Sequence, residues 1–162
     1  MVRPTKQETY FKICKDWSER SPCIRRKCGA ILVKNDSQIS QGYNGSVRGT
    51  LNCGEQTPCL KDLHNEEPLK SYVHCPAVHA ETNCIMNAAR NGLSTLGATL
   101  YLYSSIPTDS GQPCIGCRRF LIQAGIKDCF YMNGKGEVRH DYVEDWIELE
   151  NVWMKNEQNS SN

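Results

Sequence analysis

The sequence contains no long apolar run. Nowhere does it approach the roughly 20 consecutive apolar residues that a membrane-spanning helix needs. Its first residues, MVRPTKQETYFKICKDW, also lack the apolar core of a secretory signal peptide. We therefore expect a protein that works in the cytoplasm and has no membrane partner.

The sequence also has no surplus of one charge. Lysine and arginine number 19, aspartate and glutamate 18, and the net charge is +1 with no run of like charge. Proteins that bind nucleic acid gather several basic residues on one face to contact phosphates. The composition therefore argues against a nucleic-acid partner, but it allows a small charged ligand.

Cysteine, by contrast, is abundant, with ten residues. In a reducing compartment, clustered cysteines bind metals or carry chemistry more often than they form disulfides. We therefore expect at least one metal ion. The length suits a single domain with a real core, which we place at residues 1–155, followed by a disordered polar tail at 156–162.

The apolar pattern predicts a layered α/β domain, in which helices alternate with strands through the second half of the chain. The first strand is apolar enough to lie at the centre of a sheet. Helices are expected over 5–20, 79–91, 114–125 and 143–155, and strands over 28–34, 37–44, 98–104 and 126–132. Residues 45–77 show no such pattern and are too long for an ordinary connection, so something other than secondary structure must order them.

A histidine and a glutamate lie one residue apart in VHAETN, at the start of the second expected helix. Further along, PCIGC places Cys114 and Cys117 where the first turn of a helix directs both sulfurs to one point. With His79 they form a three-ligand zinc site whose fourth position is open to water, as in catalytic zinc sites. Glu81 is too close to His79 to bind the same ion, but it can reach the water and carry protons.

Each of these residues has a simpler interpretation on its own. His79 can cap a helix, the cysteine pair can be a redox motif, and Glu81 can be a first-turn acid that favours the helix dipole. The combination is more specific. His-x-Glu followed by Pro-Cys-x-x-Cys is similar to the signature of zinc-dependent nucleobase deaminases.

Four segments resemble the deoxycytidylate (dCMP) deaminases, especially the phage and bacterial members. In order they are SPCIRRKCGAILVK, GYNGSVRGTLNCGE, HAETNCIMNAARNG and PCIGCRRFLIQAGIKDCFY, which together cover most of residues 21–132. The resemblance implies a three-layer α/β/α cytidine deaminase-like fold, with a central mixed five-stranded sheet and helices on both faces. It also implies hydrolytic deamination of dCMP to dUMP and ammonia, which supplies dUMP for thymidylate synthesis.

The same resemblance assigns residues to the substrate. By position, Asn44 would bind the deoxyribose or base, Arg90 would hold the 5′-phosphate, and Tyr131 would line the pocket. Asn44 is also a common turn residue beside glycine, and Arg90 can simply favour the helix end. Arg25 and Arg26 are competing cations for a phosphate of the substrate or of an effector.

Regulation is a further implication of the resemblance. Many members are homohexamers that dCTP activates and dTTP inhibits, with Mg²⁺ accompanying the triphosphate. The implied effector site lies near the GYNG loop at a subunit boundary and contains Arg26, Lys27, Gly42, Asn44, Gly45, Arg48 and Gly49. This chain departs from the family in having Val47 where a proline is expected, and in a long segment at 104–113 before the cysteine pair.

A second, structural zinc is implied by cysteines at positions where relatives often carry them. Four thiolates leave no coordination position open, as in structural zinc sites, and they would brace the 45–77 insertion. The implied ligands are Cys23, Cys53, Cys59 and Cys75, with His64 or His74 as possible replacements. Alternatively, these cysteines are buried free thiols that pack as small apolar groups.

Two other functions remain as alternatives. A deaminase of tRNA or another nucleic-acid base would share the same zinc residues, but the near-neutral charge argues against it. A nonenzymatic zinc module that binds a nucleotide or partner would not need Glu81 or an open coordination position. We therefore expect an enzyme that acts on free dCMP.

Overall fold

The computed structural model describes residues 2–55, 58–65 and 73–160. A mixed sheet lies at its centre, in the strand order β2-β1-β5-β6-β7. Its strands are β1 (Cys28–Lys34), β2 (Ser37–Tyr43), β5 (Thr99–Ser104), β6 (Asp128–Met132) and β7 (Val138–Tyr142). β5 and β6 run parallel, and the other neighbours are antiparallel. The predicted mixed sheet of five strands is confirmed.

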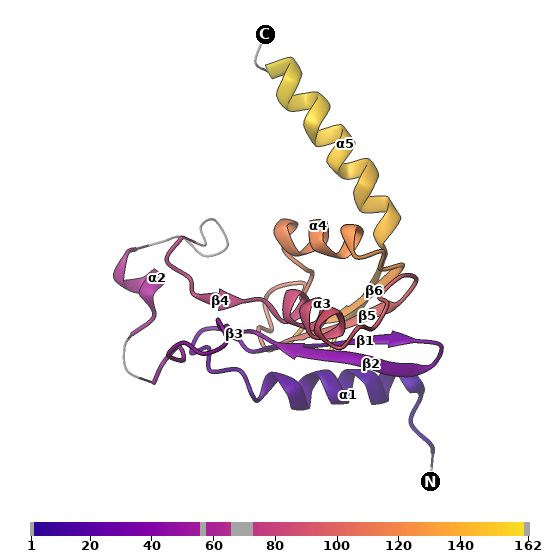
Figure 1. Cartoon of the computed structure of the whole chain (residues 1–162), viewed down its shortest axis with the longest axis horizontal. Coiled ribbons are helices and arrows are strands. Elements are labelled where there is room, and N and C mark those ends of the chain that lie inside the picture. Colours follow the sequence, from indigo (N-terminus) through magenta and orange to yellow (C-terminus); the bar gives the residue numbers. More distant parts are fainter. Residues whose placement is uncertain (1, 56–57, 66–72, 161–162) are drawn as a thin grey trace.

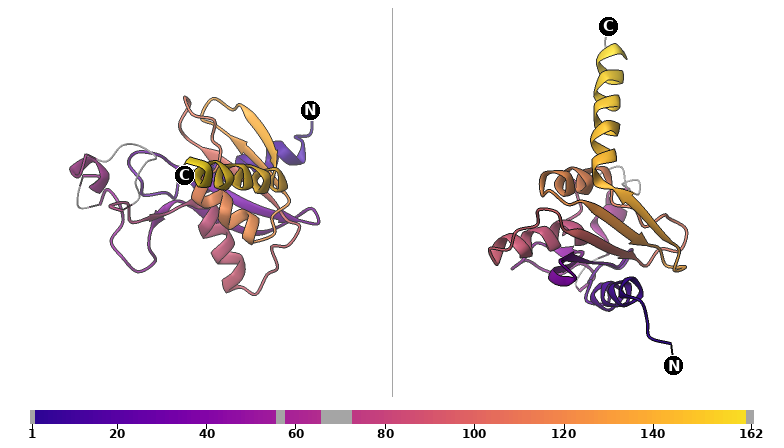
Figure 2. Two further views of the ribbon diagram at one scale, coloured as in Figure 1. Left: turned by 90° about the horizontal axis from the view of Figure 1, so that it is seen from above. Right: turned by 90° about the vertical axis from the view of Figure 1, so that its right-hand side faces the viewer.

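Helices cover both faces of this sheet. Helix α1 (Lys6–Ser18) lies on one face, and α3 (Ala80–Arg90) and α4 (Ile115–Gln123) lie on the other (Figure 1). Helix α5 (Val143–Ser160) starts beside α4 and extends away from the body of the domain (Figure 2). In the described part of the chain, no helix is both long and apolar enough to cross a bilayer. The predicted three-layer arrangement is confirmed.

Strand β1 holds the layers together because its side chains alternate between two apolar clusters. Ala30 and Leu32 belong to the larger cluster, which includes residues of α3 and α4. Ile31 and Val33 pack in the other direction, against α1. β1 lies between β2 and β5, so its predicted central position is also confirmed.

Local signals set the first elements. Thr5 caps α1 in a capping box, in which its hydroxyl accepts from the Glu8 amide at 3.2 Å and its own amide donates to the Glu8 carboxylate at 2.7 Å. Between β1 and β2, Asn35 and Asp36 both have positive φ, 50° and 61°. Such a turn matches the twist of two antiparallel strands, so the chain folds back into the expected hairpin.

In its described residues, the insertion after β2 forms only short elements. Strands β3 (Gly45–Ser46) and β4 (Ala77–Val78) pair with each other, and a four-residue helix, α2 (Leu60–Leu63), lies between them in sequence. Residues 56–57 and 66–72 of the predicted insertion lie outside the described residues.

Two features of the C-terminal part differ from expectation. Strand β7, which the sequence did not predict, is a polar edge strand whose residues are mostly exposed. Helix α5 continues to Ser160, so residues 156–160 are helical and not a disordered tail. The Ser160 hydroxyl donates to the Asn156 carbonyl at 2.9 Å, and the glutamate and glutamine between them are good helix formers. Residues 161–162 lie outside the described residues.

Candidate active site

Helices α3 and α4 begin at the same end of the sheet, and each begins at a predicted metal ligand. His79 is the N-cap of α3 and Cys114 the N-cap of α4, and neither side chain makes a capping hydrogen bond. His79 Nδ1 lies 3.5 Å from Cys114 Sγ and 3.3 Å from Cys117 Sγ. The structure thus brings three residues together that are far apart in the sequence.

The spacing of these atoms fits a zinc ion. Zn–N and Zn–S bonds of about 2.0 and 2.3 Å at tetrahedral angles place nitrogen and sulfur about 3.5 Å apart, close to the observed 3.3 and 3.5 Å. All three ligand atoms lie within 4.8 Å of one another. One imidazole and two thiols are also the donor set that zinc prefers.

Electrostatics favour a thiolate in this cluster even without an ion. The Cys117 thiol donates to Cys114, which lowers the pKa of Cys114 well below that of an ordinary thiol. The pKa of Cys117 is raised in turn, because its thiol would have to give up the proton that it donates to Cys114, and because burial disfavours the charged form. The hydrogen bond to Cys114 also raises the pKa of His79. The contacts within the cluster therefore favour the thiolate form of Cys114, which is the form in which cysteine binds a metal ion.

Glu81 lies in the first turn of α3, close to the candidate metal ligand His79, and is only 5% exposed. Burial raises the pKa of its carboxyl above the ordinary value, and the positive charges of His79 and Arg26 oppose that shift. A buried carboxyl whose pKa moves toward neutrality is suited to accept and release protons. Its location agrees with the predicted role as a proton carrier, which remains a prediction.

Asn44 ties the strand ends beside this cluster together. Its side-chain oxygen accepts from the Cys28 amide at 2.7 Å, and its amide nitrogen donates to the Arg26 carbonyl at 2.8 Å. Asn44 is buried, and its own carbonyl accepts from the Ser21 hydroxyl at 2.7 Å. It therefore has a structural role beside the predicted substrate contact, which remains a prediction.

Arg26 lies on the segment before β1 and is held at two points. Its Nε donates to the Ser104 hydroxyl at 3.0 Å, and its guanidinium lies 3.0 Å from the Asp109 carboxylate. The nearby charges of Cys28, Asp109 and Glu81 raise the pKa of Arg26 despite its burial. This cation therefore borders the candidate site.

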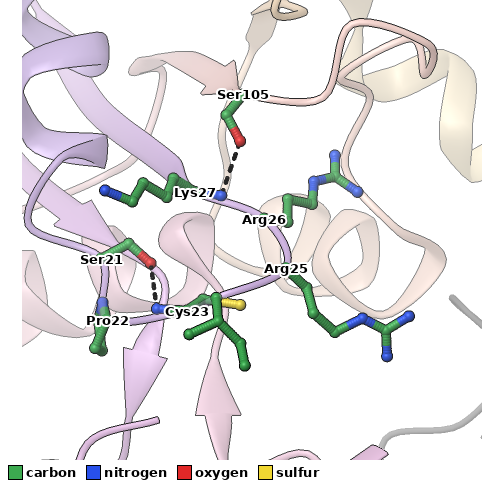
Figure 3. Close-up of a pocket in the computed structure, with 8 residues that line it drawn as sticks. Ser21, Pro22, Cys23, Arg25, Arg26, Lys27 and Ser105 are labelled. Atoms are coloured by element: carbon green, nitrogen blue, oxygen red, sulfur yellow. Dashed lines mark hydrogen bonds between the residues drawn. The ribbon is translucent and has the colours of Figure 1, made fainter. Parts of the chain in front are cut away.

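A basic cavity of about 570 Å³ adjoins this segment. Residues 21–27 and Ser105 line it, and they include Arg25, Arg26 and Lys27. In Figure 3, the side chains of Arg25 and Arg26 extend to one side of the segment and that of Lys27 to the other. Each of the three cations also forms an ion pair with an acidic residue that does not line the cavity. Arg25 pairs with Asp62 at 3.1 Å, Arg26 with Asp109 at 3.0 Å and Lys27 with Glu19 at 3.2 Å.

Arg90 and Tyr131 lie elsewhere. Arg90 is the last residue of α3 and is exposed. Nine residues separate it from Glu81 along the helix, which is about 14 Å at a rise of 1.5 Å per residue. Tyr131 is buried in the core, and its hydroxyl donates to Asp141 at 3.2 Å. The structure does not bring Arg90 to the candidate zinc ligands, and the predicted roles of Arg90 and Tyr131 remain predictions.

The residues predicted for an effector site have mixed surroundings. Gly42 is buried against the backbone of α3, whereas Gly45 pairs with Val78 in the small sheet. Arg48 is exposed and donates to the Asn87 side chain at 3.1 Å, and Gly49 has a φ of 88° in an exposed turn. An effector at this loop remains a prediction.

The predicted second zinc site is not assembled in the described residues. Among these residues, the one group of candidate ligands whose atoms lie within 4.8 Å of one another is that of the first site, His79, Cys114 and Cys117. Cys53 instead contacts the Ser46 hydroxyl at 3.5 Å. The rings of His64 and His74 stack with centroids 3.7 Å apart, so the two alternative ligands are at least adjacent. The second zinc remains a prediction.

Several residues that shape the site were not singled out from the sequence. Thr82 contacts the Cys117 sulfur at 3.7 Å, and Ser104 and Asp109 hold Arg26. Asp141 contacts the loop before Cys114 through Gln112 at 2.7 Å. The unusual length of the 104–113 segment was the one available signal for Asp109. Nothing in the sequence gave a signal for Asp141, because no motif relates β7 to the cysteine pair.

Comparisons with known proteins agree with this geometry. Residues 4–133 match the family model of the cytidine and deoxycytidylate deaminase zinc-binding region. The chain is 32% identical over 136 residues to a deoxycytidylate deaminase of Mycobacterium phage D29, covering 81% of this chain and 97% of that protein. It is also 32% identical over 136 residues to ComE operon protein 2 of Bacillus subtilis, covering 84% of this chain but only 62% of that protein.

A solved structure shows the same fold. The dCMP deaminase of cyanophage S-TIM5, in complex with dCMP and dUMP, superposes with a TM-score of 0.61 at 30% identity, over 82% of this chain and 85% of that one. The predicted cytidine deaminase-like fold is thereby confirmed. The residues that converge at the starts of α3 and α4 lie within the matched zinc-binding region, and the chain belongs to the cytidine and deoxycytidylate deaminase family.

Proposed function

We propose that this protein is a zinc-dependent hydrolase that converts dCMP to dUMP and ammonia, and so provides dUMP for thymidylate synthesis. The observation that carries the proposal is the convergence of His79, Cys114 and Cys117 within 4.8 Å, with buried Glu81 in the first turn of α3, the helix whose N-cap is His79. Relatives named deoxycytidylate deaminase and the cyanophage enzyme that binds dCMP and dUMP support the choice of substrate.

The residues of the site divide the reaction between them. When bound, zinc lowers the pKa of a coordinated water to about 7 and so provides hydroxide at neutral pH. Glu81 accepts the proton of the attacking water and delivers it to N3 of the cytosine ring as oxygen adds to C4. Glu81 then moves the remaining hydroxyl proton to the amino group, the C4–N bond breaks, and ammonia leaves uracil behind.

The basic cavity suits the phosphate of a nucleotide. Arg25, Arg26 and Lys27 place three cations around one space, and the charge of Arg26 acts on Glu81. An incoming phosphate can compete with Asp109 for Arg26, because guanidinium binds carboxylate and phosphate in the same fork geometry. Arg90, about 14 Å along α3 from Glu81, is the alternative phosphate ligand within this chain.

Kinetics with dCMP and deoxycytidine distinguish the two arginines. Arg26→Ala should lower kcat/KM for dCMP by about 10-fold or more, as expected for one charged hydrogen bond, and change deoxycytidine turnover much less. Arg90→Ala is the matched variant and should have little effect on either. Equal loss for both substrates in Arg26→Ala would reject its phosphate role, and a dCMP-specific loss in Arg90→Ala would restore the prediction from the sequence.

Ammonia release tests the function itself. The substrates are dCMP, dCTP, cytidine and a tRNA oligonucleotide, and we expect turnover of dCMP above all others. Preference for the oligonucleotide would indicate a nucleic-acid base deaminase, against the near-neutral charge. No turnover of any substrate, with zinc and dTTP still bound, would indicate a nonenzymatic module.

We further propose the regulation and second metal site that the family pattern suggests. dCTP with Mg²⁺ would activate and dTTP would inhibit a homohexamer, and the exposed Arg48 and Gly49 beside the GYNG sequence support a phosphate site at a loop. Cys23, Cys53, Cys59 and Cys75 would hold a structural zinc in the 45–77 insertion. Light scattering and dCMP assays with each effector test the regulation.

A further inference from the structure

One carboxylate joins three elements behind the cysteine pair. Asp141, in β7, accepts from Gln112 Nε2 at 2.7 Å, from Trp146 Nε1 at 3.1 Å and from the Tyr131 hydroxyl at 3.2 Å. The donors come from the loop before α4, from α5 and from β6. Asp141 lies beyond residues 4–133, the part of the chain that the family model matches.

The connection continues from Gln112 to the first turn of α4. The side-chain oxygen of Gln112 accepts from the Arg118 guanidinium. A carboxylate can only accept and a guanidinium can only donate, so Gln112 has a single amide orientation that satisfies both neighbours. Asp141 therefore sets the orientation of Gln112, and Gln112 presents its oxygen to Arg118.

Arg118 in turn fixes the backbone beside both thiols. Its Nε donates to the Pro113 carbonyl at 3.0 Å, and Pro113 is fully buried. Its guanidinium also lies over the ring of Trp146, 5.5 Å from the centroid, so α5 supports it from the other side. Pro113 precedes Cys114 and Arg118 follows Cys117, so these contacts flank the two cysteines.

We propose that Asp141 is a positioning residue for the zinc site: through Gln112 and Arg118 it holds the 112–118 segment so that Cys114 and Cys117 face His79. The inference depends on zinc binding by these three residues and not on the identity of the substrate. Polar groups that orient metal ligands typically change metal affinity by about 10- to 100-fold when they are lost.

The test measures zinc affinity directly. Asp141→Ala removes the single carboxylate oxygen that accepts from both Gln112 and Trp146. We expect zinc to bind about 10- to 100-fold more weakly in competition with a chromophoric chelator, and the visible spectrum of the Co²⁺-substituted protein to change. Asp128→Ala is the matched control, because Asp128 contacts His140 at 2.9 Å on the neighbouring strand and has no contact with Gln112 or Arg118 among the described hydrogen bonds.

A double variant separates positioning from general destabilisation. Gln112→Glu alone places two carboxylates together, but combined with Asp141→Asn it again pairs a donor with an acceptor and keeps an acceptor for Arg118. The second change does not strengthen the Trp146 contact, so tighter zinc binding in the double variant than in Gln112→Glu alone supports the proposal. Zinc binding in the double variant that is no tighter than in Gln112→Glu, or wild-type affinity in Asp141→Ala, would overturn it.

Gln112→Ala provides a second route if Asp141→Ala does not fold. It removes the connection but leaves Tyr131 and Trp146 with their acceptor, and the same weakening of zinc and the same Co²⁺ spectral change are expected. Unchanged zinc binding in Gln112→Ala would overturn the proposal. If wild-type protein binds zinc but deaminates nothing, the proposed function fails and the positioning role is still decided by these affinities.

Discussion

Replacing Gly42 by alanine perturbs the contact between β2 and the helix that carries His79 and Glu81. A Cβ atom at this residue would lie 2.5 Å from the Ala80 carbonyl oxygen and 2.6 Å from the Cys84 amide nitrogen, where ordinary contact begins at 3.4 Å. Both neighbours are backbone atoms of α3, so no side-chain rotation relieves the clash. The strand and the helix must separate by about 0.9 Å, the difference between 3.4 and 2.5 Å.

Overpacking of this kind lowers the free energy of unfolding by about 1–3 kcal/mol. In a chain of this size each kcal/mol corresponds to about 2–4 °C in Tm, so we expect Gly42→Ala to melt about 2–12 °C lower. The same displacement moves His79 relative to sulfur atoms that now lie 3.3 and 3.5 Å from its ring nitrogen. Zinc affinity should therefore fall together with stability.

Circular dichroism melting and chelator competition measure the two effects. Gly45→Ala is the control, because its Cβ would meet only side-chain atoms, with Pro22 Cδ nearest at 3.3 Å. The reasoning would be refuted if Gly42→Ala melted with the wild-type protein and bound zinc as tightly. It would also be refuted if the control lost as much stability as Gly42→Ala.

Two further predictions concern the metal and the acid. Glu81→Gln should keep its zinc, measured by metal analysis, and lose about 100-fold or more in kcat, since the amide cannot carry protons; full activity would remove Glu81 from the proton path. Metal analysis should find about two zinc ions per wild-type chain and about one in Cys59→Ser, because four thiolates close a structural site. A single zinc in the wild-type protein would contradict the second site.

Elements with local signals were predictable from the sequence. The Thr5 and Glu8 capping box, the Asn35 turn and the alternation along β1 each depend on neighbours within a few residues. Strand β7 was not predictable, because an edge strand exposed to solvent has the polar composition of a loop. Its pairing with β6 appears only when the parallel β5 and β6 have formed a sheet.

The candidate site divides in the same way. His79, Glu81, Cys114 and Cys117 could be found because each lies at a helix start with a readable spacing. Whether Arg90 contacts the substrate could not be predicted, because its distance from Glu81 along the helix does not say how far a bound nucleotide reaches. Asp141 could not be found either, because its contact with Gln112 spans 29 residues and depends on the assembled sheet.

The starts of α3 and α4 have a consequence for order in the domain. Caps with a side-chain acceptor satisfy first-turn amides and stabilise a helix by about 1 kcal/mol, but His79 and Cys114 are N-caps that form no such bond. The ion that joins them would then anchor the beginning of two helices at once. When it dissociates, both first turns are free to fray, so amide exchange there would accelerate before the sheet loosens.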